Sequence, residues 1–172
     1  MADFTPICMW VLRQEDSTLS GVVKNLGDGQ GLTRFGVGQK SHPELGDVFY
    51  TMPASGALSI AEGVYHDTYW NRFQGDRIVD NGVASCLLSF SINDGTNREV
   101  RMLQKILSLP QDGVVGPATL MHTNGTDQQW LAAALRSAQA AFYEELAPGR
   151  PDIAAELPGL LARARRVYPS LA

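Results

Sequence analysis

The segment DGQGLTRFGVG, residues 28–38, places four glycines among eleven residues. Asp28 comes first, and Thr33, Arg34 and Phe35 lie in the middle. Glycine adopts turn conformations that strain other residues, and Asp-Gly is a frequent hairpin turn. Because Thr33 follows Asp28 by five residues, the two side chains can face each other across a tight turn. The segment predicts a β-hairpin, which serves either as an ordinary turn or as a surface that holds Asp28 and Thr33 against a substrate.

Helical patterns flank this hairpin on both sides. Apolar residues recur at helical spacing before it and predict a first helix that has Thr5 as its N-cap and ends close to Glu15. After the hairpin, Ser59 and Glu62 form a capping-box pattern that predicts a second helix. Residues 79–92 are apolar at nearly every turn, which is typical of a buried central helix. Further helices are expected to start at Thr96, Pro117, Asp127 and Asp152, the last interrupted at Pro158.

These patterns predict a mainly α (α+β) protein. We expect a helical bundle around the buried central helix, with a small β-hairpin near the N-terminus. We expect one region over residues 1–94, which contains the hairpin, and a helical region over residues 95–172, packed together as one compact unit. A chain of 172 residues is long enough to bury a core of ordinary size.

The composition argues against several classes of function. The 14 Lys and Arg residues against 18 Asp and Glu give a net charge of −4, without a long block of like charge, so we expect no nucleic-acid partner. No apolar run approaches the roughly 20 residues that span a bilayer, so we expect no membrane partner. The first residues lack the features of a secretory signal, so we expect synthesis in the cytoplasm without a signal peptide. We also expect a monomer.

Cysteine and histidine give no sign of metal or nucleophile chemistry. Cys8 and Cys86 lie in apolar segments, which favours buried thiols over a disulfide or a nucleophile. The three histidines are far apart, and none has a partner at metal-ligand spacing. We therefore expect neither a metal site nor a cofactor.

Carboxylates remain as general acids and bases, and Glu15 has a distinctive position among them. It falls where an apolar helix stops and a glycine-rich segment starts. A carboxyl group held against the apolar side of a helix has a raised pKa and can keep a proton near neutral pH. The alternative is that Glu15 and Asp16 end the helix in solvent.

Six short motifs follow one another along the chain: VLRQEDS, DGQGLTRFGVG, AEGVYHDTYW, SFSINDG, LQKIL and DGVVGPATL. Their order resembles glycoside hydrolase family 108, the lysozyme-like muramidases, with the peptidoglycan-binding region that follows their catalytic part. The similarity runs from about Val11 to Arg166. Three segments depart from the family pattern: Asp16-Ser17 replaces two glycines, Gly29-Gln30 replaces Pro-Gly, and Ser89 replaces an acid.

The resemblance implies a lysozyme-like fold and cleavage of the β-1,4 bond between N-acetylmuramic acid and N-acetylglucosamine. By analogy Glu15 is the general acid, Asp28 the base or charge stabiliser, and Thr33 positions the attacking water. A carboxyl separation of about 6.5 to 9.5 Å between Glu15 and Asp28 would imply inversion, and about 5 to 5.5 Å retention. Five further residues are candidate glycan contacts: Arg34, Phe35, Tyr69, Trp70 and Asn93. The alternatives are an ordinary surface position for Arg34, core packing for the three aromatic residues, and a structural hydrogen bond to the hairpin backbone for Asn93.

The resemblance leaves the biological setting and the chemistry open. The protein would act on peptidoglycan glycan strands in the periplasm or cell wall, either as a phage endolysin or as a type VI-type antibacterial effector. A delivered effector would have a periplasmic immunity protein as a partner. The alternatives are a lytic transglycosylase that cuts the same bond and a non-catalytic peptidoglycan-binding module, for which Ser89 is the main argument.

Overall fold

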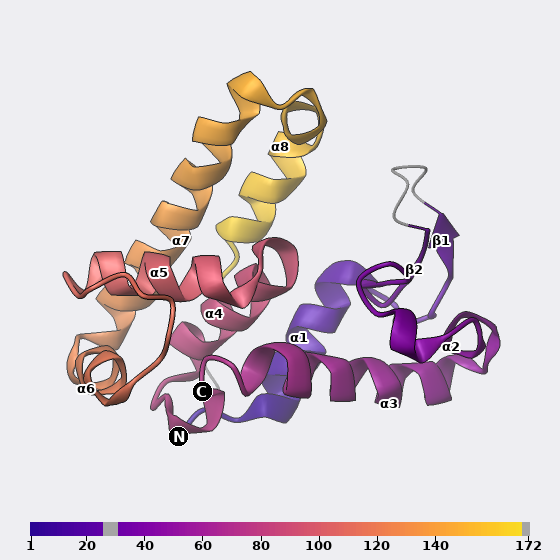
Figure 1. Cartoon of the computed structure of the whole chain (residues 1–172), viewed down its shortest axis with the longest axis horizontal. Helices are drawn as coiled ribbons and strands as arrows, with labels where there is room; N and C mark the ends of the chain where they lie inside the picture. The colour runs from indigo at the N-terminus through magenta and orange to yellow at the C-terminus, as the bar shows by residue number, and fades with distance from the viewer. Residues whose placement is uncertain (26–30, 170–172) are drawn as a thin grey trace.

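The computed structural model describes residues 1–25 and 31–169 and shows a mainly α, lysozyme-like fold with a small antiparallel sheet (Figure 1). This architecture confirms the predicted fold class. The α-helices are α1 (Phe4–Glu15), α2 (Val48–Thr51), α3 (Ala54–Val64), α4 (Asn81–Asp94), α5 (Thr96–Ile106), α6 (Pro117–Gly125), α7 (Gln128–Leu146) and α8 (Pro151–Ala164). The remaining helical segments are η1 (Pro43–Leu45), the π-helical η2 (Tyr65–Trp70), η3 (Gly75–Arg77) and η4 (Ala147–Gly149).

Helix α4 lies at the centre of the molecule, as its apolar sequence predicts. It contacts α1 and η2 from the N-terminal part of the chain and α5 and α7 from the C-terminal part. Side chains on nearly every face of α4 are buried, and Val83, Leu87 and Leu88 have no exposed surface. Helices α7 and α8 lie side by side and extend away from α4 (Figure 1). Within the described residues, no helix combines the length and apolar character needed to cross a bilayer.

Several predicted helix ends are wrong, for local reasons. Asp3, not Thr5, caps α1, because its carboxylate accepts a hydrogen bond from the Thr5 N–H at 3.2 Å. Helix α3 begins at Ala54, and the Ser59 hydroxyl inside it donates to the Ser55 carbonyl instead of capping. Helix α8 continues through Pro158, supported by its packing on α7.

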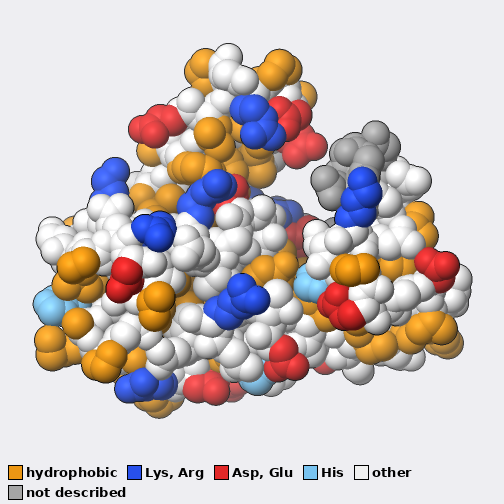
Figure 2. Space-filling view, in the orientation of Figure 1, with side chains coloured by type: hydrophobic (Ala, Val, Ile, Leu, Met, Phe, Trp, Pro, Cys, Tyr) orange, Lys and Arg blue, Asp and Glu red, His pale blue; other side chains and the backbone are white. Residues whose placement is uncertain are grey.

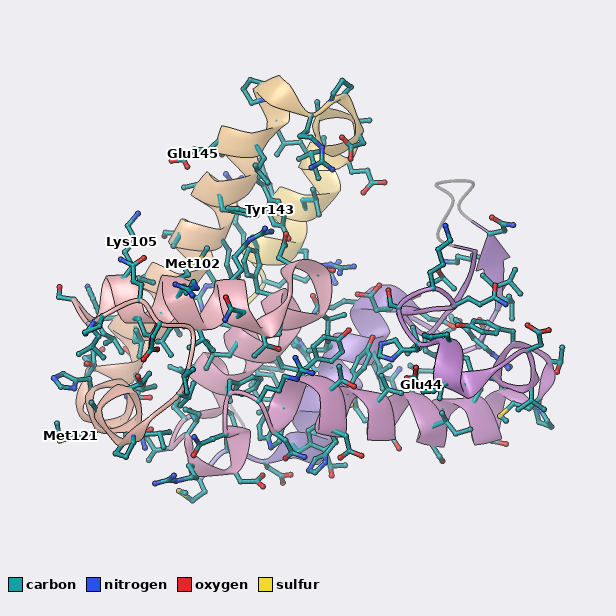
Figure 3. All side chains as sticks on the ribbon, in the orientation of Figure 1. Glu44, Met102, Lys105, Met121, Tyr143 and Glu145 are labelled. Atoms are coloured by element: carbon teal, nitrogen blue, oxygen red, sulfur yellow. The ribbon has the colours of Figure 1, made fainter. Side chains whose placement is uncertain are left out.

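Glu99, in the first turn of α5, is fully buried and faces α7. One Glu99 carboxylate oxygen accepts a 3.1 Å hydrogen bond from Gln139 Nε2, and the other has no partner among the described residues. Nearby, Tyr143 of α7, which is labelled in Figure 3, donates a hydrogen bond from its hydroxyl group to the Asp94 carboxylate at the end of α4. Burial raises the pKa of Glu99 well above its ordinary value; the Gln139 hydrogen bond lowers it and the charge of Asp94 raises it further.

Replacing Glu99 by Gln is expected to stabilise the protein in a pH-dependent way. Because the folded pKa lies above the ordinary value of 4.5, the folded state favours the protonated acid and loses stability as pH rises above 4.5. Glutamine keeps a neutral donor and acceptor, so the gain should be about 1–2 kcal/mol at pH 8 and near zero at pH 4. Thermal unfolding of both proteins at the two pH values checks this, and an equal gain at both would contradict it.

The sheet has three short antiparallel strands, β1 (Lys24–Asn25), β2 (Leu32–Arg34) and β3 (Val37–Gly38). Thr33 in β2 pairs with Lys24 on one side and with Gly38 on the other. Phe35 and Gly36 connect β2 and β3 with φ values of 50° and 75°, the left-handed conformations of a tight two-residue hairpin turn. The predicted hairpin is thus present, and its described turn lies at Phe35-Gly36.

Asp16 organises the chain between α1 and the sheet, where the family pattern has glycine. Its carboxylate accepts from the Gly21 N–H at 2.7 Å, from the Ser20 hydroxyl at 3.0 Å, and from the N–H and hydroxyl of Thr18. Burial raises the pKa of Asp16, but the hydrogen bonds from Gly21, Ser20 and Thr18 outweigh it and lower the pKa to about 2. The ionised Asp16 therefore holds the loop that leaves Glu15.

Replacing Asp16 by Asn is expected to weaken this loop only where the carboxylate is charged. The folded pKa of about 2 lies below the ordinary 3.8, so the contribution is complete above 3.8 and is lost as pH falls through 2. We expect a loss of about 1 kcal/mol at pH 7 that shrinks towards pH 2. Urea unfolding across this range measures the difference, and a constant difference would refute the assignment.

Candidate active site

Glu15 is the last residue of α1, and its side chain lies directly against the hairpin turn. A methyl group placed at Gly36 would lie 2.9 Å from Glu15 Cγ and 2.5 Å from the Tyr65 hydroxyl. Tyr65 donates a 2.8 Å hydrogen bond to the Phe35 carbonyl and so fixes the turn to η2. Burial and the charge of Glu15 raise the Tyr65 pKa well above its ordinary value, so the hydroxyl remains a donor. The turn and Glu15 therefore have a fixed relative position.

Glu15 lines a cavity on each side. The cavity on the hairpin side has a volume of about 120 Å³, and Thr33 and Phe35 also line it. The second cavity, of about 670 Å³, lies between the ends of α1 and α4 and the helix α8. Figure 2 shows a hollow between the part of the surface formed by α7 and α8 and the part that carries the hairpin. The fold thus brings Glu15, Thr33 and Phe35 together and exposes one acid to two cavities.

Arg163 of α8 forms an ion pair with Glu15. Its Nη1 lies 2.6 Å from Glu15 Oε1, and the Glu15 and Arg163 side chains are 18% and 23% exposed. The same Nη1 donates to Asn93 Oδ1 at 2.5 Å. Asn93 Nδ2 in turn donates to the Ser89 carbonyl at 3.1 Å. Asn93 thus bonds to α8 and to the backbone of its own helix, not to the hairpin backbone as its structural alternative had it, and it also lines the larger cavity.

The structure corrects the predicted glycan contacts of Arg34 and Trp70. The Arg34 guanidinium is buried and donates 2.8 Å hydrogen bonds to the carbonyls of Gly21, Phe49 and Met52, so it anchors β2 to α2. Trp70 has no exposed surface, and its indole N–H donates to Asp76 at 2.8 Å. Both side chains are occupied inside the protein, where a glycan does not reach them.

The other candidate residues differ in how close they lie to Glu15. Phe35 lines the small cavity although its side chain is nearly buried. Tyr69 is partly buried, packs edge-on against Tyr65 at 6.1 Å between ring centroids, and lines neither cavity beside Glu15. Asp28, the predicted base, lies outside the described residues. Thr33 and Phe35 are therefore the predicted neighbours that the structure places beside Glu15.

Arg163 is a site residue that the sequence does not reveal. This arginine lies in the last turn of α8, in a stretch that also contains Arg165 and Arg166, and no local pattern distinguishes it from a surface cation. Its role arises because α8 returns to the end of α1 in the fold. Only a long-range contact could have identified it.

Neither cysteine lines the two cavities beside Glu15. Cys8 and Cys86 are buried free thiols, as predicted, and burial raises both pKa values to about 12. Among residues 1–25 and 31–169, no three His, Cys, Asp or Glu side chains gather closely enough to hold a metal ion. The side chains that bear chemistry in the two cavities beside Glu15 are carboxyl groups, one hydroxyl group and cations: Glu15, Asp16, Glu156, Thr33, Lys24, Arg163 and Arg166.

Comparison with known proteins shows similarity to a family of peptidoglycan domains and to a solved structure. Residues 98–165, from α5 to α8, match the family PG_binding_3, described as "Predicted Peptidoglycan domain". The solved structure of Brucella abortus SagA is 24% identical, with a TM-score of 0.66 over 95% of this chain and 96% of that chain, and shares the fold. A search of the curated proteins found no match. Arg163 lies inside the segment that matches the peptidoglycan domain, so that segment reaches the side chain of Glu15.

Proposed function

We propose that the protein is a peptidoglycan glycoside hydrolase, a muramidase that hydrolyses the β-1,4 bond between N-acetylmuramic acid and N-acetylglucosamine. The observation that carries the proposal is the position of Glu15, between a cavity beside the hairpin and a larger cavity beside α8. The match of residues 98–165 to a peptidoglycan domain supports the substrate class.

The reaction needs a proton donor and an attacking water. Glu15, which forms an ion pair with Arg163 in the structure, has to be protonated to act as the acid. It then donates that proton to the glycosidic oxygen as the bond to N-acetylglucosamine breaks, while water adds to the anomeric carbon of N-acetylmuramic acid and loses a proton to the base. The Thr33 hydroxyl lines the same small cavity as Glu15 and can accept a hydrogen bond from that water. Asp28 is our proposed base or charge stabiliser for the developing positive charge.

Incubation with isolated sacculi tests the proposal. The wild-type protein is expected to release muropeptides that end in a reducing N-acetylmuramic acid. A lytic transglycosylase would leave a 1,6-anhydro end instead, because the sugar's own hydroxyl replaces water. A non-catalytic module would bind the sacculi and release nothing. Either of these results would overturn the hydrolase assignment.

We further propose that the protein is made in the cytoplasm and acts in the periplasm, as an endolysin or as a type VI-type effector with an immunity protein. Cytoplasm contains no peptidoglycan strands, so the substrate itself requires delivery. Expression in a Gram-negative host with and without an added periplasmic export signal tests this proposal. Lysis is expected only with export, and lysis without either export or a holin would contradict it.

A further inference from the structure

The larger cavity beside Glu15 is lined by several charged and polar side chains that have no role in the proposed hydrolysis step. It lies between α1, α4 and α8, and its volume of about 670 Å³ falls in the range of small-molecule sites. Its polar lining comes from distant parts of the chain: Gln14, Glu15, Asn93, Glu156, Arg163 and Arg166. We call this cavity the α8 groove.

Arg163 lines the α8 groove, and one nitrogen of its guanidinium group, Nη1, is held in place by contacts within the protein. Nη1 contacts both Glu15, at 2.6 Å, and Asn93, at 2.5 Å. No described residue forms a hydrogen bond or ion pair with its Nε or Nη2. These two nitrogens form the edge of the guanidinium that binds a carboxylate with two parallel hydrogen bonds. The two contacts of Nη1 therefore hold a ready carboxylate-binding group next to Glu15.

Two other side chains in the groove lack partners. Arg166, one turn further along the chain, is exposed and makes no side-chain hydrogen bond or ion pair with the described residues. The amide nitrogen and oxygen of Gln14 are shielded from solvent and also lack partners in the described part of the chain. An unpartnered shielded amide costs free energy that a bound ligand can recover. The guanidinium groups of Arg163 and Arg166 and the amide of Gln14 are thus available to bind one ligand in the groove.

We propose that the α8 groove binds the muramyl unit of the glycan through its acidic substituent, the lactyl-linked stem peptide, with carboxylates on Arg163 and Arg166. The inference rests on the proposed function and names the part of the substrate that the site recognises. N-acetylglucosamine has the same ring and acetamido group but no acidic substituent. Arginine pairs with carboxylate in a geometry that neither a hydroxyl nor an acetamido group can reproduce. The groove would therefore place an acid-bearing sugar, and not plain N-acetylglucosamine, beside Glu15.

The test measures equilibrium binding by NMR titration of the whole protein. The ligand is the disaccharide-peptide N-acetylglucosaminyl-N-acetylmuramyl-tetrapeptide, which lacks the bond that a muramidase cuts. The comparison ligand is N,N′-diacetylchitobiose, a disaccharide of the same ring size without acid. Replacing Arg166 by Gln is expected to weaken binding of the disaccharide-peptide about threefold to tenfold, and Arg163→Gln about tenfold or more. Chitobiose affinity should stay unchanged in Arg166→Gln.

Arg165→Gln, directly after the end of α8 and next to Arg166, is the matched control. Arg165 pairs with Glu144 of α7 at 3.5 Å and does not line the groove, so its loss should leave both affinities unchanged. If Arg163→Gln fails to fold, Arg166→Gln still decides the question, because Arg166 is exposed and has no side-chain partner in the described residues.

Three results would overturn the inference. They are unchanged affinity of Arg166→Gln for the disaccharide-peptide, equal losses for both ligands, and binding of the free tetrapeptide as tightly as the disaccharide-peptide. The assay is independent of turnover. Arginine-dependent binding without release of reducing ends from sacculi would refute the hydrolase and keep the groove, whereas hydrolysis without arginine-dependent binding would refute only the groove.

Discussion

Replacing Glu15 by Gln is expected to lower the rate of reducing-end release from sacculi by about 10²- to 10⁴-fold. Glutamine has nearly the same shape as glutamate, but it cannot donate a proton to the glycosidic oxygen. Among the described residues, Glu15 has the only carboxyl group that lines both the cavity beside the hairpin and the cavity beside α8, so no other described acid can take its place in the proposed reaction. The loss should appear in kcat, with binding of the disaccharide-peptide changed much less.

Glu145→Gln is the control for this variant. Glu145 of α7 is exposed and lines neither of the two cavities beside Glu15. We expect activity within about twofold of wild type, since a solvent-exposed surface substitution has small effects. Thermal unfolding of both variants separates a lost proton donor from a lost fold. Activity of Glu15→Gln within tenfold of wild type would contradict the role of Glu15.

Replacing Gly36 by Ala is expected to damage both stability and activity. Gly36 has a φ of 75°, and the added methyl group would lie 2.5 Å from the Tyr65 hydroxyl and 2.9 Å from Glu15 Cγ. No side chain tolerates contacts this short, so the turn must move away from Glu15 or the two side chains must shift. We expect a loss of about 2–3 kcal/mol in the free energy of unfolding and at least about tenfold in activity.

Gly38→Ala is the matched control in the same hairpin. A methyl group there would meet its nearest neighbours at 3.7 Å and 3.9 Å, which is ordinary contact, and Gly38 does not have a left-handed φ. Urea unfolding and the sacculus assay should therefore show little change. If the two variants behaved alike, close contact between the turn and Glu15 could not be the cause.

The parts of the site that the sequence could predict are those set by local patterns. The helix that ends at Glu15 follows from its apolar spacing, and the hairpin follows from its glycines. The buried centre of α4 follows from a sequence that is apolar on all sides. These features need no knowledge of the rest of the chain, and the structure confirms each of them. The catalytic role of Glu15 stays a prediction.

The parts that the sequence could not predict depend on contacts between distant segments. Arg34 reads as a surface residue in a hairpin, but its guanidinium is taken up by carbonyls from α2 and from the loop after α1. Arg163 reads as one of several cations at the end of a helix, but α8 packs so that it reaches Glu15. In both cases the sequence shows the arginine but not its partner, because tertiary packing determines which group the arginine contacts.

Mass spectrometry of the muropeptides released from sacculi by the wild-type protein and by Glu15→Gln tests the central claim most directly. The wild-type protein is expected to produce fragments that end in reducing N-acetylmuramic acid, each with the added mass of one water relative to the 1,6-anhydro form. Glu15→Gln should produce almost none. Fragments with 1,6-anhydro ends, or equal amounts of reducing-end fragments from the two proteins, would contradict hydrolysis by Glu15.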